Sequence, residues 1–334
     1  MGKLFLFCIF LATSSAAFAE IPPGKISGGR AHEMPAWFKS SFLNFQDEVG
    51  ELRASGRHIL VFMDLNDCPY CARTLGENFH QGANREYIQK NFDVIAVNVR
   101  GAGDVTWIDG ANYSEQELAL KLKVYATPTL VFIDPDGKKV LQLNGYRSPA
   151  SLRHALEYVH TKAYRQQSLA AFTEKQKAAP VYKMREHVRF EKINDFSRVR
   201  TPLAVIFEDP HCVDCARFHD KVLNHPEVLT ELKPFRVARL DASTDTPLVD
   251  VSGARTTPRA WAAALGLDYR PGVVLFQDGK EITRLEGRFY HFHFKELLRY
   301  VSGRHYQRYD RFGAYLNDRQ AELLRQGVNI DLSE

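Results

Sequence analysis

Cysteine is scarce in this sequence, and its few copies are unevenly placed. The 334 residues contain five cysteines, and four of them form two Cys-x-x-Cys pairs, Cys68/Cys71 and Cys212/Cys215. This distribution excludes the dense disulfide framework of small secreted domains, which depends on many spaced cysteines. The function of these two pairs is therefore the main question that the sequence raises.

Long apolar runs are also missing. The apolar stretch at 4–12 follows Lys3 and precedes the small-residue tripeptide Ala-Phe-Ala at 17–19. It is far shorter than the roughly 20 residues of a membrane-spanning helix, and its flanks are those of a secretory signal peptide. We therefore expect residues 1–19 to be removed on export and the mature protein to be periplasmic, without stable membrane insertion.

The chain lacks a strong excess of charge of either sign. It carries 44 Lys and Arg residues against 40 Asp and Glu residues, a formal net charge of +4. A nucleic-acid-binding domain usually concentrates basic residues on one face, so we expect no nucleic-acid partner. The length is enough for two domains of ordinary size.

One unit is present twice, at an offset of about 142 to 144 residues. An apolar strand precedes each cysteine pair, a helix and a second strand follow it, and a capped helix comes next, with Ser114 and Thr257 as equivalent N-caps. A hairpin with an Asp-Gly turn and a closing helix complete each copy. The expected strands lie at 59–63, 94–99, 129–133, 203–207, 235–240 and 272–276, and the closing helices at 151–159 and 292–301.

This order of elements predicts the fold class. Strand, helix, strand, helix, strand, strand and helix form a central mixed sheet with helices on both faces. We expect two such α/β domains in tandem, at 37–174 and 190–334, joined by a Lys-rich linker at 175–189. Residues 20–36 are expected to form an extended arm, and Tyr/Phe-rich tails predict an extra C-terminal helix in each repeat.

A Cys-x-x-Cys pair at the start of a helix has a direct chemical use. The unpaired N–H groups and the dipole at the helix N-terminus favour the thiolate of the first cysteine. That thiolate attacks a disulfide of the substrate, and the second cysteine resolves the mixed disulfide. Cys68 and Cys212 are the predicted nucleophiles, Cys71 and Cys215 the predicted resolving thiols, and no cofactor is expected.

Both halves resemble domains of the thioredoxin superfamily, over nearly all of the expected mature chain. In the first half the resemblance rests on a strand leading to Cys-Pro-Tyr-Cys at 68–71, a helix ending at Ala-Thr-Pro at 126–128, and a strand with a Gly-Lys turn. It implies a thiol-disulfide oxidoreductase that acts on protein thiols and disulfides. It also implies a cis peptide bond before Pro128, whose loop with Thr127 lines a substrate groove beside Pro69 and Tyr70.

The second half offers two candidates for the equivalent cis-proline. Thr257-Pro258 is more like the family dipeptide, but Pro258 is only 46 residues after Cys212, whereas Pro128 is 60 residues after Cys68. Pro271 is 59 residues after Cys212, and Pro258 suits the first turn of a capped helix. We therefore predict the cis bond at Arg270-Pro271, with Arg270 making the second groove more basic.

The chain departs from ordinary thioredoxins. The usual Trp-Cys-Gly-Pro-Cys is absent, and Phe62 and Ile206 replace the buried acid six residues before the first cysteine. Both copies instead place an acid four residues before it, Asp64 and Glu208. These acids either transfer protons to the resolving thiols or are merely exposed at strand ends, and we expect the second.

The overall pattern is most similar to exported thioredoxins of the SoxW type. That resemblance implies partners in sulfur-compound oxidation or cytochrome maturation, and a redox partner that recycles the protein. Reduction of protein disulfides is the favoured direction, and disulfide oxidation or isomerisation is the alternative.

The residues between the cysteines differ between the two pairs. Pro69-Tyr70 is glutaredoxin-like, whereas Asp214 puts a carboxylate near Cys212 that should raise the pKa of its thiol. We therefore expect the second site to be the weaker oxidant, with His211 acting in the opposite sense if protonated. Such unlike sites also suggest an electron relay between the pairs.

Other interpretations remain open. The pairs could be structural staples, but such short bridges constrain little of the unfolded chain. Four thiolates could bind zinc or copper, but zinc pairs are usually about 15 to 20 residues apart. A chaperone-like module, or one catalytic and one binding half, would also fit. The segment 101–113 with Trp107 is expected only in the first copy, in the groove or between the domains, and we expect ordinary surface or interface roles for His291, His293 and His305.

Overall fold

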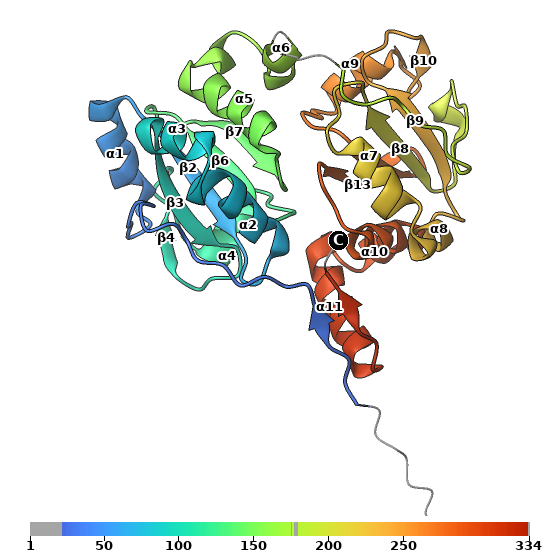
Figure 1. Cartoon of the computed structure of the whole chain (residues 1–334), viewed down its shortest axis with the longest axis horizontal. Helices are drawn as coiled ribbons and strands as arrows, with labels where there is room; N and C mark the ends of the chain where they lie inside the picture. The colour runs from blue at the N-terminus through green and yellow to red at the C-terminus, as the bar shows by residue number, and fades with distance from the viewer. Residues whose placement is uncertain (1–21, 175, 177–179, 333–334) are drawn as a thin grey trace, which may run out of the picture.

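The computed structural model describes residues 22–174, 176 and 180–332, so the predicted signal peptide lies outside the described residues. The two halves of the chain form two α/β lobes that lie side by side (Figure 1). Within the described part, every helix is too short or too polar to cross a bilayer.

The first lobe is built on a four-stranded mixed sheet. Its central strand, β2 (His58–Asp64), runs parallel to β3 (Phe92–Asn98) and antiparallel to β6 (Thr129–Ile133). The hairpin strand β7 (Lys139–Asn144) completes the order β3-β2-β6-β7.

Strand β2 is buried along its whole length because the sheet is covered on both faces. Leu60 and Phe62 point into one hydrophobic core, and Ile59, Val61 and Met63 point into the other. Residues alternate between the faces of a strand, so a continuous apolar run is the pattern that a doubly covered strand requires. The remaining elements of this lobe are α1 (Phe45–Ser55), α2 (Pro69–Thr74), η1 (Leu75–His80), α3 (Ala83–Asn91), β4 (Asp104–Thr106), β5 (Asn112–Ser114), α4 (Glu115–Lys121), α5 (Pro149–His160), η2 (Ala163–Arg165) and α6 (Leu169–Glu174).

The second lobe repeats this sheet strand by strand. β8 (Leu203–Glu208) is parallel to β9 (Arg236–Asp241) and antiparallel to β12 (Gly272–Gln277), which pairs with β13 (Lys280–Glu286). Even the β-bulges correspond, between Phe132 and Ile133 in one hairpin and between Leu275 and Phe276 in the other. The other elements are η3 (Phe196–Arg198), α7 (Cys215–Arg217), η4 (Phe218–Leu223), α8 (Pro226–Glu231), β10 (Leu248–Val249), β11 (Arg255–Thr256), α9 (Pro258–Ala264), α10 (His291–Ser302), η5 (His305–Gln307) and α11 (Phe312–Arg325).

The fold class predicted from the sequence is therefore confirmed, including a further helix after each closing helix. The expected caps are also present. Ser114 forms a capping box with Glu117 at the start of α4, and Thr257 caps α9 with Pro258 in its first turn.

The prediction about the segment with Trp107 is wrong. Its hairpin, β4-β5, has a counterpart in β10-β11 at the equivalent place of the second lobe. The Trp107 ring packs against Phe45, with 4.8 Å between the ring centroids, inside the core of the first lobe. Trp107 lies neither in a substrate groove nor between the lobes, because its side chain fills the hydrophobic core beneath the β4-β5 hairpin.

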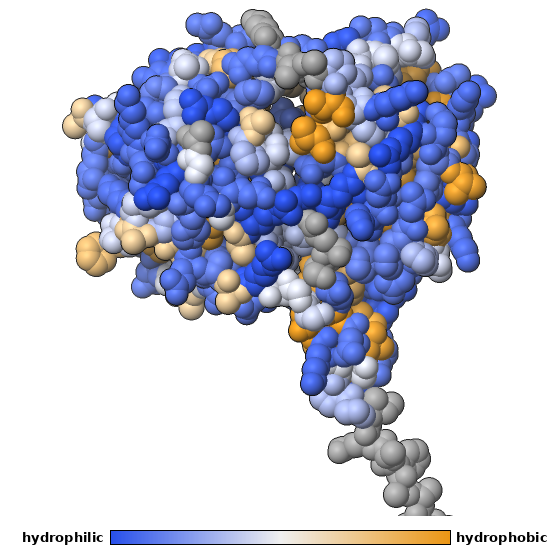
Figure 2. All heavy atoms as spheres, viewed as in Figure 1, coloured by the Kyte–Doolittle hydropathy of each residue, from blue (hydrophilic) through white to orange (hydrophobic). Residues whose placement is uncertain are grey.

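The N-terminal arm links the two lobes. Its strand β1 (Ile26–Ser27) pairs in parallel with β14 (Ile330–Asp331), next to α11, and the chain then continues to the first lobe (Figure 1). The strands β1 and β14 and the helix α11 project from the two lobes (Figure 1). Figure 2 shows a largely hydrophilic face, with hydrophobic residues gathered where this projection joins the lobes. The two ends of the described chain are thus held together.

Two equivalent glycines meet at the interface between the lobes. The amide N–H of Gly145 donates to the Pro128 carbonyl at 2.8 Å, and that of Gly287 donates to the Pro271 carbonyl at 3.0 Å. A Cβ atom on Gly287 would lie 2.9 Å from the Tyr146 carbonyl oxygen, across the interface. The repeat is therefore also a pseudo-symmetric contact between the lobes.

We expect Gly287→Ala to lower the free energy of unfolding by about 2–3 kcal/mol, because it combines an unfavourable positive φ with a clash against the facing lobe. The control is Gly266→Ala, whose φ of +68° is also positive but whose Cβ would meet nothing within 4 Å. Urea unfolding of both variants measures the difference. Equal losses would show that close packing at Gly287 contributes nothing.

Candidate active sites at the two cysteine pairs

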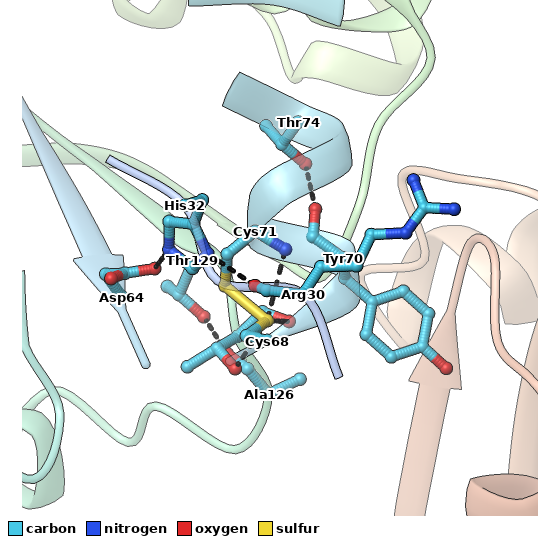
Figure 3. Close-up of a disulfide and its surroundings, with 10 residues drawn as sticks. Arg30, His32, Asp64, Cys68, Tyr70, Cys71, Thr74, Ala126 and Thr129 are labelled. Atoms are coloured by element: carbon cyan, nitrogen blue, oxygen red, sulfur yellow. Dashed lines mark hydrogen bonds and ion pairs between the residues drawn. A yellow bond between two sulfur atoms is a disulfide. The ribbon is translucent and has the colours of Figure 1, made fainter. Parts of the chain in front are cut away.

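The first cysteine pair lies at the N-terminus of α2. Cys68 is the N-cap, and its sulfur accepts a hydrogen bond from the Cys71 amide at 3.1 Å. Pro69 occupies the first turn, where its missing N–H breaks no helical hydrogen bond. The two cysteines are joined as a disulfide with 5.2 Å between their Cα atoms, and both are buried (Figure 3).

The loop before β6 lies against this disulfide. The peptide bond between Thr127 and Pro128 is cis, as predicted. The Thr127 hydroxyl donates to the Cys68 sulfur at 3.4 Å, and the Thr127 carbonyl oxygen is 3.7 Å from the same sulfur. The structure therefore brings together Cys68, Cys71 and Thr127-Pro128, whereas the role of this loop in holding substrate stays a prediction.

Asp64 is buried beside the first site and paired with a histidine that the sequence did not single out. Its Oδ1 lies 2.9 Å from Nε2 of His32, which belongs to the N-terminal arm. Burial raises the pKa of the Asp64 carboxyl, and His32 opposes that shift. Figure 3 shows this pair on one side of the disulfide, with Tyr70 pointing away on the other. The interpretation of Asp64 as an acid merely exposed at a strand end is wrong.

The second cysteine pair differs at the start of its helix. Cys212 and Cys215 form a disulfide with 5.5 Å between their Cα atoms, but α7 begins only at Cys215. Cys212 therefore precedes the helix and does not cap it, contrary to the prediction. This copy has no proline to start the helix early, and the Asp214 side chain is engaged elsewhere.

The cis bond of the second lobe is at Arg270-Pro271, as the spacing predicted. The expected basic groove is not borne out by the position of the Arg270 side chain. Its guanidinium donates to the carbonyls of Leu267 and Tyr269 at 2.9 and 3.0 Å, and lies 3.5 Å from the Asp209 carboxylate. Its charge is largely compensated within its own lobe because the side chain turns inward.

Glu208 is the centre of a buried polar cluster in the second site. Its side chain is 0% exposed, its Oε1 lies 2.7 Å from Nε2 of His219, and its Oε2 accepts a hydrogen bond from the Tyr182 hydroxyl at 3.1 Å. Burial and the Glu208 charge raise the pKa of Tyr182. The Tyr182 ring also packs on Cys212 and Cys215. The acid is again buried and not exposed at a strand end.

Each site is thus covered by the segment that precedes its lobe. In the first, the arm is held by the Arg30 amide, which donates to the Asp67 carbonyl at 3.1 Å. In the second, the amides of Val181 and Tyr182, in the predicted linker, donate to the Pro210 carbonyl at 2.9 and 3.0 Å. Both segments deliver a side chain to the acid of their site, His32 to Asp64 and Tyr182 to Glu208.

The first site faces the second lobe through Tyr70. Its ring stacks on Tyr290 with 4.3 Å between the centroids, and its hydroxyl accepts the Tyr290 amide hydrogen at 2.9 Å. The same hydroxyl lies 3.3 Å from Nδ1 of His293. Burial lowers the pKa of His293 to about 4, so the ring is neutral at pH 7 and its Nδ1 can accept the Tyr70 proton.

The second site faces the first lobe in a corresponding way. Asp214 accepts a hydrogen bond from the Tyr269 hydroxyl at 2.8 Å, and that hydroxyl accepts the Ser148 amide hydrogen of the first lobe at 3.3 Å. The Arg288 guanidinium lies 3.6 Å from the Asp214 carboxylate. Asp214 is thus partly compensated, which weakens the effect that its charge was expected to have on the Cys212 thiol.

Asp268, close to the cis-proline of the second site, gives a pH-dependent prediction. Burial and the nearby Glu286 charge raise its pKa to about 6. The folded protein therefore keeps a proton that the unfolded chain loses above about pH 4, and the free energy of unfolding should fall as the pH rises from 4 to 6. We expect Asp268→Asn to stabilise the protein by about 2 kcal/mol at pH 7.5.

Urea unfolding at several pH values measures this effect, and the two proteins should converge below about pH 4. An unchanged difference between pH 4 and pH 7.5 would contradict the assignment to Asp268.

Both lobes thus contain a cysteine pair after the central strand and a cis-proline before the next strand of the sheet. The thioredoxin-like domain family matches residues 45–160 and again residues 190–302. The chain therefore belongs to the thioredoxin-like domain family, and its cysteine pairs support thiol-disulfide oxidoreductase chemistry in general.

Solved structures also resemble this chain. A thioredoxin-fold protein from Helicobacter pylori is 25% identical over 37% of this chain and 81% of its own, with a TM-score of 0.33. A thioredoxin from Thermus thermophilus is 26% identical over 36% and 85%, with a TM-score of 0.29. The DsbH oxidoreductase is 15% identical over 41% and 88%, with a TM-score of 0.28. Comparison with curated proteins gave no match.

Proposed function

We propose that this protein is a periplasmic thiol-disulfide oxidoreductase that reduces protein disulfides at two sites through mixed-disulfide intermediates. The observation that carries the proposal is that each lobe contains a buried cysteine pair and a cis-proline before the equivalent strand, with the cis-proline loop in contact with Cys68 in the first lobe. In each site the first cysteine, Cys68 or Cys212, attacks the substrate disulfide, and Cys71 or Cys215 then releases the reduced substrate.

The physiological setting is part of the same proposal. The signal-peptide pattern at 1–19 supports export to the periplasm. The resemblance to SoxW-type thioredoxins favours protein partners in sulfur-compound oxidation or cytochrome maturation, with a separate redox protein that returns electrons to the two pairs. Disulfide oxidation is the second candidate direction, and the glutaredoxin-like Pro69-Tyr70 favours it at the first site.

Asp64 and Glu208 are proposed to take the proton of the resolving thiol. Both acids are buried next to their cysteine pair and are held by a second side chain, His32 or His219. The positioned carboxylate would accept the proton of Cys71 or Cys215 as the resolving thiol attacks the mixed disulfide. The histidines orient the acid and do not touch the sulfurs in this account.

We expect Asp64→Asn to slow resolution of the mixed disulfide at the first site by at least about tenfold at neutral pH, since the amide cannot accept the proton. Single-turnover kinetics on a Cys212→Ser/Cys215→Ser background measures this step. The wild-type rate should fall as the pH drops through the Asp64 pKa. His32→Ala should move that inflection to higher pH, because His32 lowers the Asp64 pKa. An Asn variant with the parental rate and pH profile would exclude proton transfer by Asp64.

Substrate trapping tests the proposed function itself. Cys71→Ser and Cys215→Ser remove the resolving thiols, so mixed disulfides with substrates should accumulate on Cys68 and Cys212. Periplasmic extracts with each variant, followed by mass spectrometry, identify the partners, and Cys68→Ser/Cys71→Ser and Cys212→Ser/Cys215→Ser are the matched controls. Absence of any adduct that depends on Cys68 or Cys212 would contradict the proposal.

A further inference from the structure

Two histidines and a glutamate from distant parts of the second lobe come together away from both cysteine pairs. His225 immediately precedes α8, Glu227 lies in its first turn, and His291 is the first residue of α10. One ligand atom from each of the three residues lies within 4.8 Å of the other two. No short sequence motif indicates this cluster, because His225 and His291 are 66 positions apart.

The two imidazoles are arranged as a pair. Their rings stack with 3.9 Å between the centroids and 16° between the planes. Nδ1 of His225 accepts the Glu227 amide hydrogen at 3.3 Å, and it lies 4.0 Å from Glu227 Oε2. The Nδ1 lone pair of His225 therefore points toward the Glu227 amide, and a metal ion bound at Nδ1 would replace this one long hydrogen bond.

We propose that His225, Glu227 and His291 bind a divalent transition metal, with Zn²⁺ as the reference ion. Two imidazoles and a carboxylate are a ligand set that zinc uses in proteins, with water in the fourth position. With bonds of about 2.1 Å, a tetrahedral ion separates its ligand atoms by about 3.4 Å. The three atoms therefore need to approach one another by little more than an ångström. The two stacked rings also need to tilt so that one ion can lie in both ring planes, and side-chain rotation can supply both movements.

The charges around the cluster set the expected strength of binding. Lys295 donates to Oε1 of Glu227 at 2.7 Å and competes with a cation, whereas Oε2 remains on the side of His225. Binding should therefore strengthen when the Lys295 charge is removed. An increase in metal affinity on loss of the Lys295 charge would indicate that the ion binds at Glu227. If Lys295 instead holds the site in shape, its loss would weaken metal binding.

The place of the cluster gives the metal a structural effect. An ion would fasten the start of α10 to α8, and α10 follows Tyr290 directly, which stacks on Tyr70 of the first cysteine pair. The inference about binding does not depend on the proposed redox function.

Isothermal titration of the tag-free full chain with Zn²⁺ tests the proposal, with both disulfides kept oxidised so that thiolates cannot bind. We expect one equivalent to bind, with at least a tenfold loss of affinity in His225→Ala and in His291→Ala, on the order of the changes seen when metal sites lose supporting groups. His80→Ala, in the first lobe, should bind like the parent, and Lys295→Met should bind more tightly.

Circular dichroism and the melting temperature without metal establish that each variant is folded, and Zn²⁺ should raise the melting temperature of the parent but not of the His225→Ala/His291→Ala protein. Equal binding by the parent and this double variant, or weaker binding by Lys295→Met, would overturn the proposal.

Discussion

Protein carrying both Cys68→Ser and Cys212→Ser is expected to lose at least about a thousandfold in the rate of disulfide reduction, because the nucleophile of each site is gone and a serine hydroxyl cannot replace it. Insulin reduction with dithiothreitol as the electron source measures this loss. Cys68 caps α2 and contacts Thr127, whereas Cys212 precedes α7 and is the first cysteine of the second pair.

The variants Cys68→Ser and Cys212→Ser, made singly, show how much activity each site contributes. If each site turns over independently, Cys68→Ser and Cys212→Ser should each leave the activity of the other site. If electrons pass between the pairs, either substitution should abolish most of the activity. Undiminished insulin reduction by the double variant would contradict the proposed chemistry, and a purely chaperone-like activity that survives it would favour a binding module.

His219→Ala is expected to lower the free energy of unfolding by about 2–3 kcal/mol, because it leaves one oxygen of a buried carboxyl group without its hydrogen-bond partner. Glu208 is fully buried, and without His219 it keeps only the Tyr182 hydroxyl among its described side-chain partners. Urea unfolding monitored by circular dichroism measures the loss. A smaller effect is expected for His225→Ala, whose side chain is 31% exposed.

The double variant Glu208→Gln/His219→Ala provides the internal test of this explanation. Removing the carboxylate charge together with its partner should recover part of the lost stability, so the two changes should be strongly non-additive. A loss below about 1 kcal/mol in His219→Ala, or strict additivity in the double variant, would contradict a buried interacting pair at this position.

Much of the fold could be predicted from the sequence because its signals are local. The apolar strand before each cysteine pair, the caps at Ser114 and Thr257 and the Asp-Gly turns each lie within a few residues of what they specify. The cis bond at Pro271 could be predicted because the number of residues from Cys212 to Pro271 nearly equals the number from Cys68 to Pro128. The repeat made this comparison possible.

The rest depends on contacts between distant segments. His32 reaches Asp64 from the arm, and Tyr182 reaches Glu208 from the predicted linker, so neither pair has a sequence spacing that announces it. The inward turn of Arg270 follows from carbonyls and a carboxylate that only the folded loop brings near. A histidine seven residues after Cys212, absent from the first copy, was the one available signal for His219.

The interface between the lobes was likewise invisible in the sequence. Tyr70 stacks on Tyr290 of the second lobe, a contact that the sequence did not indicate, and its expected contact with substrate stays a prediction. Stacking of the Tyr70 ring and two hydrogen bonds at its hydroxyl explain why a tyrosine suits this place. Each cysteine pair therefore lies next to the other lobe, which a reading of either motif alone does not reveal.

The reduction potential of each cysteine pair is the most direct test of the central claim that both pairs are redox-active. Each potential is measured by equilibration with glutathione, with the other pair changed to serine, and the dithiol fraction is counted by alkylation and mass spectrometry. We predict reversible exchange for both pairs within the range of about −270 to −120 mV spanned by thioredoxin-fold oxidoreductases, with the Cys68 pair the more oxidising. A pair that stays oxidised below about −300 mV would be a structural disulfide and would contradict the account.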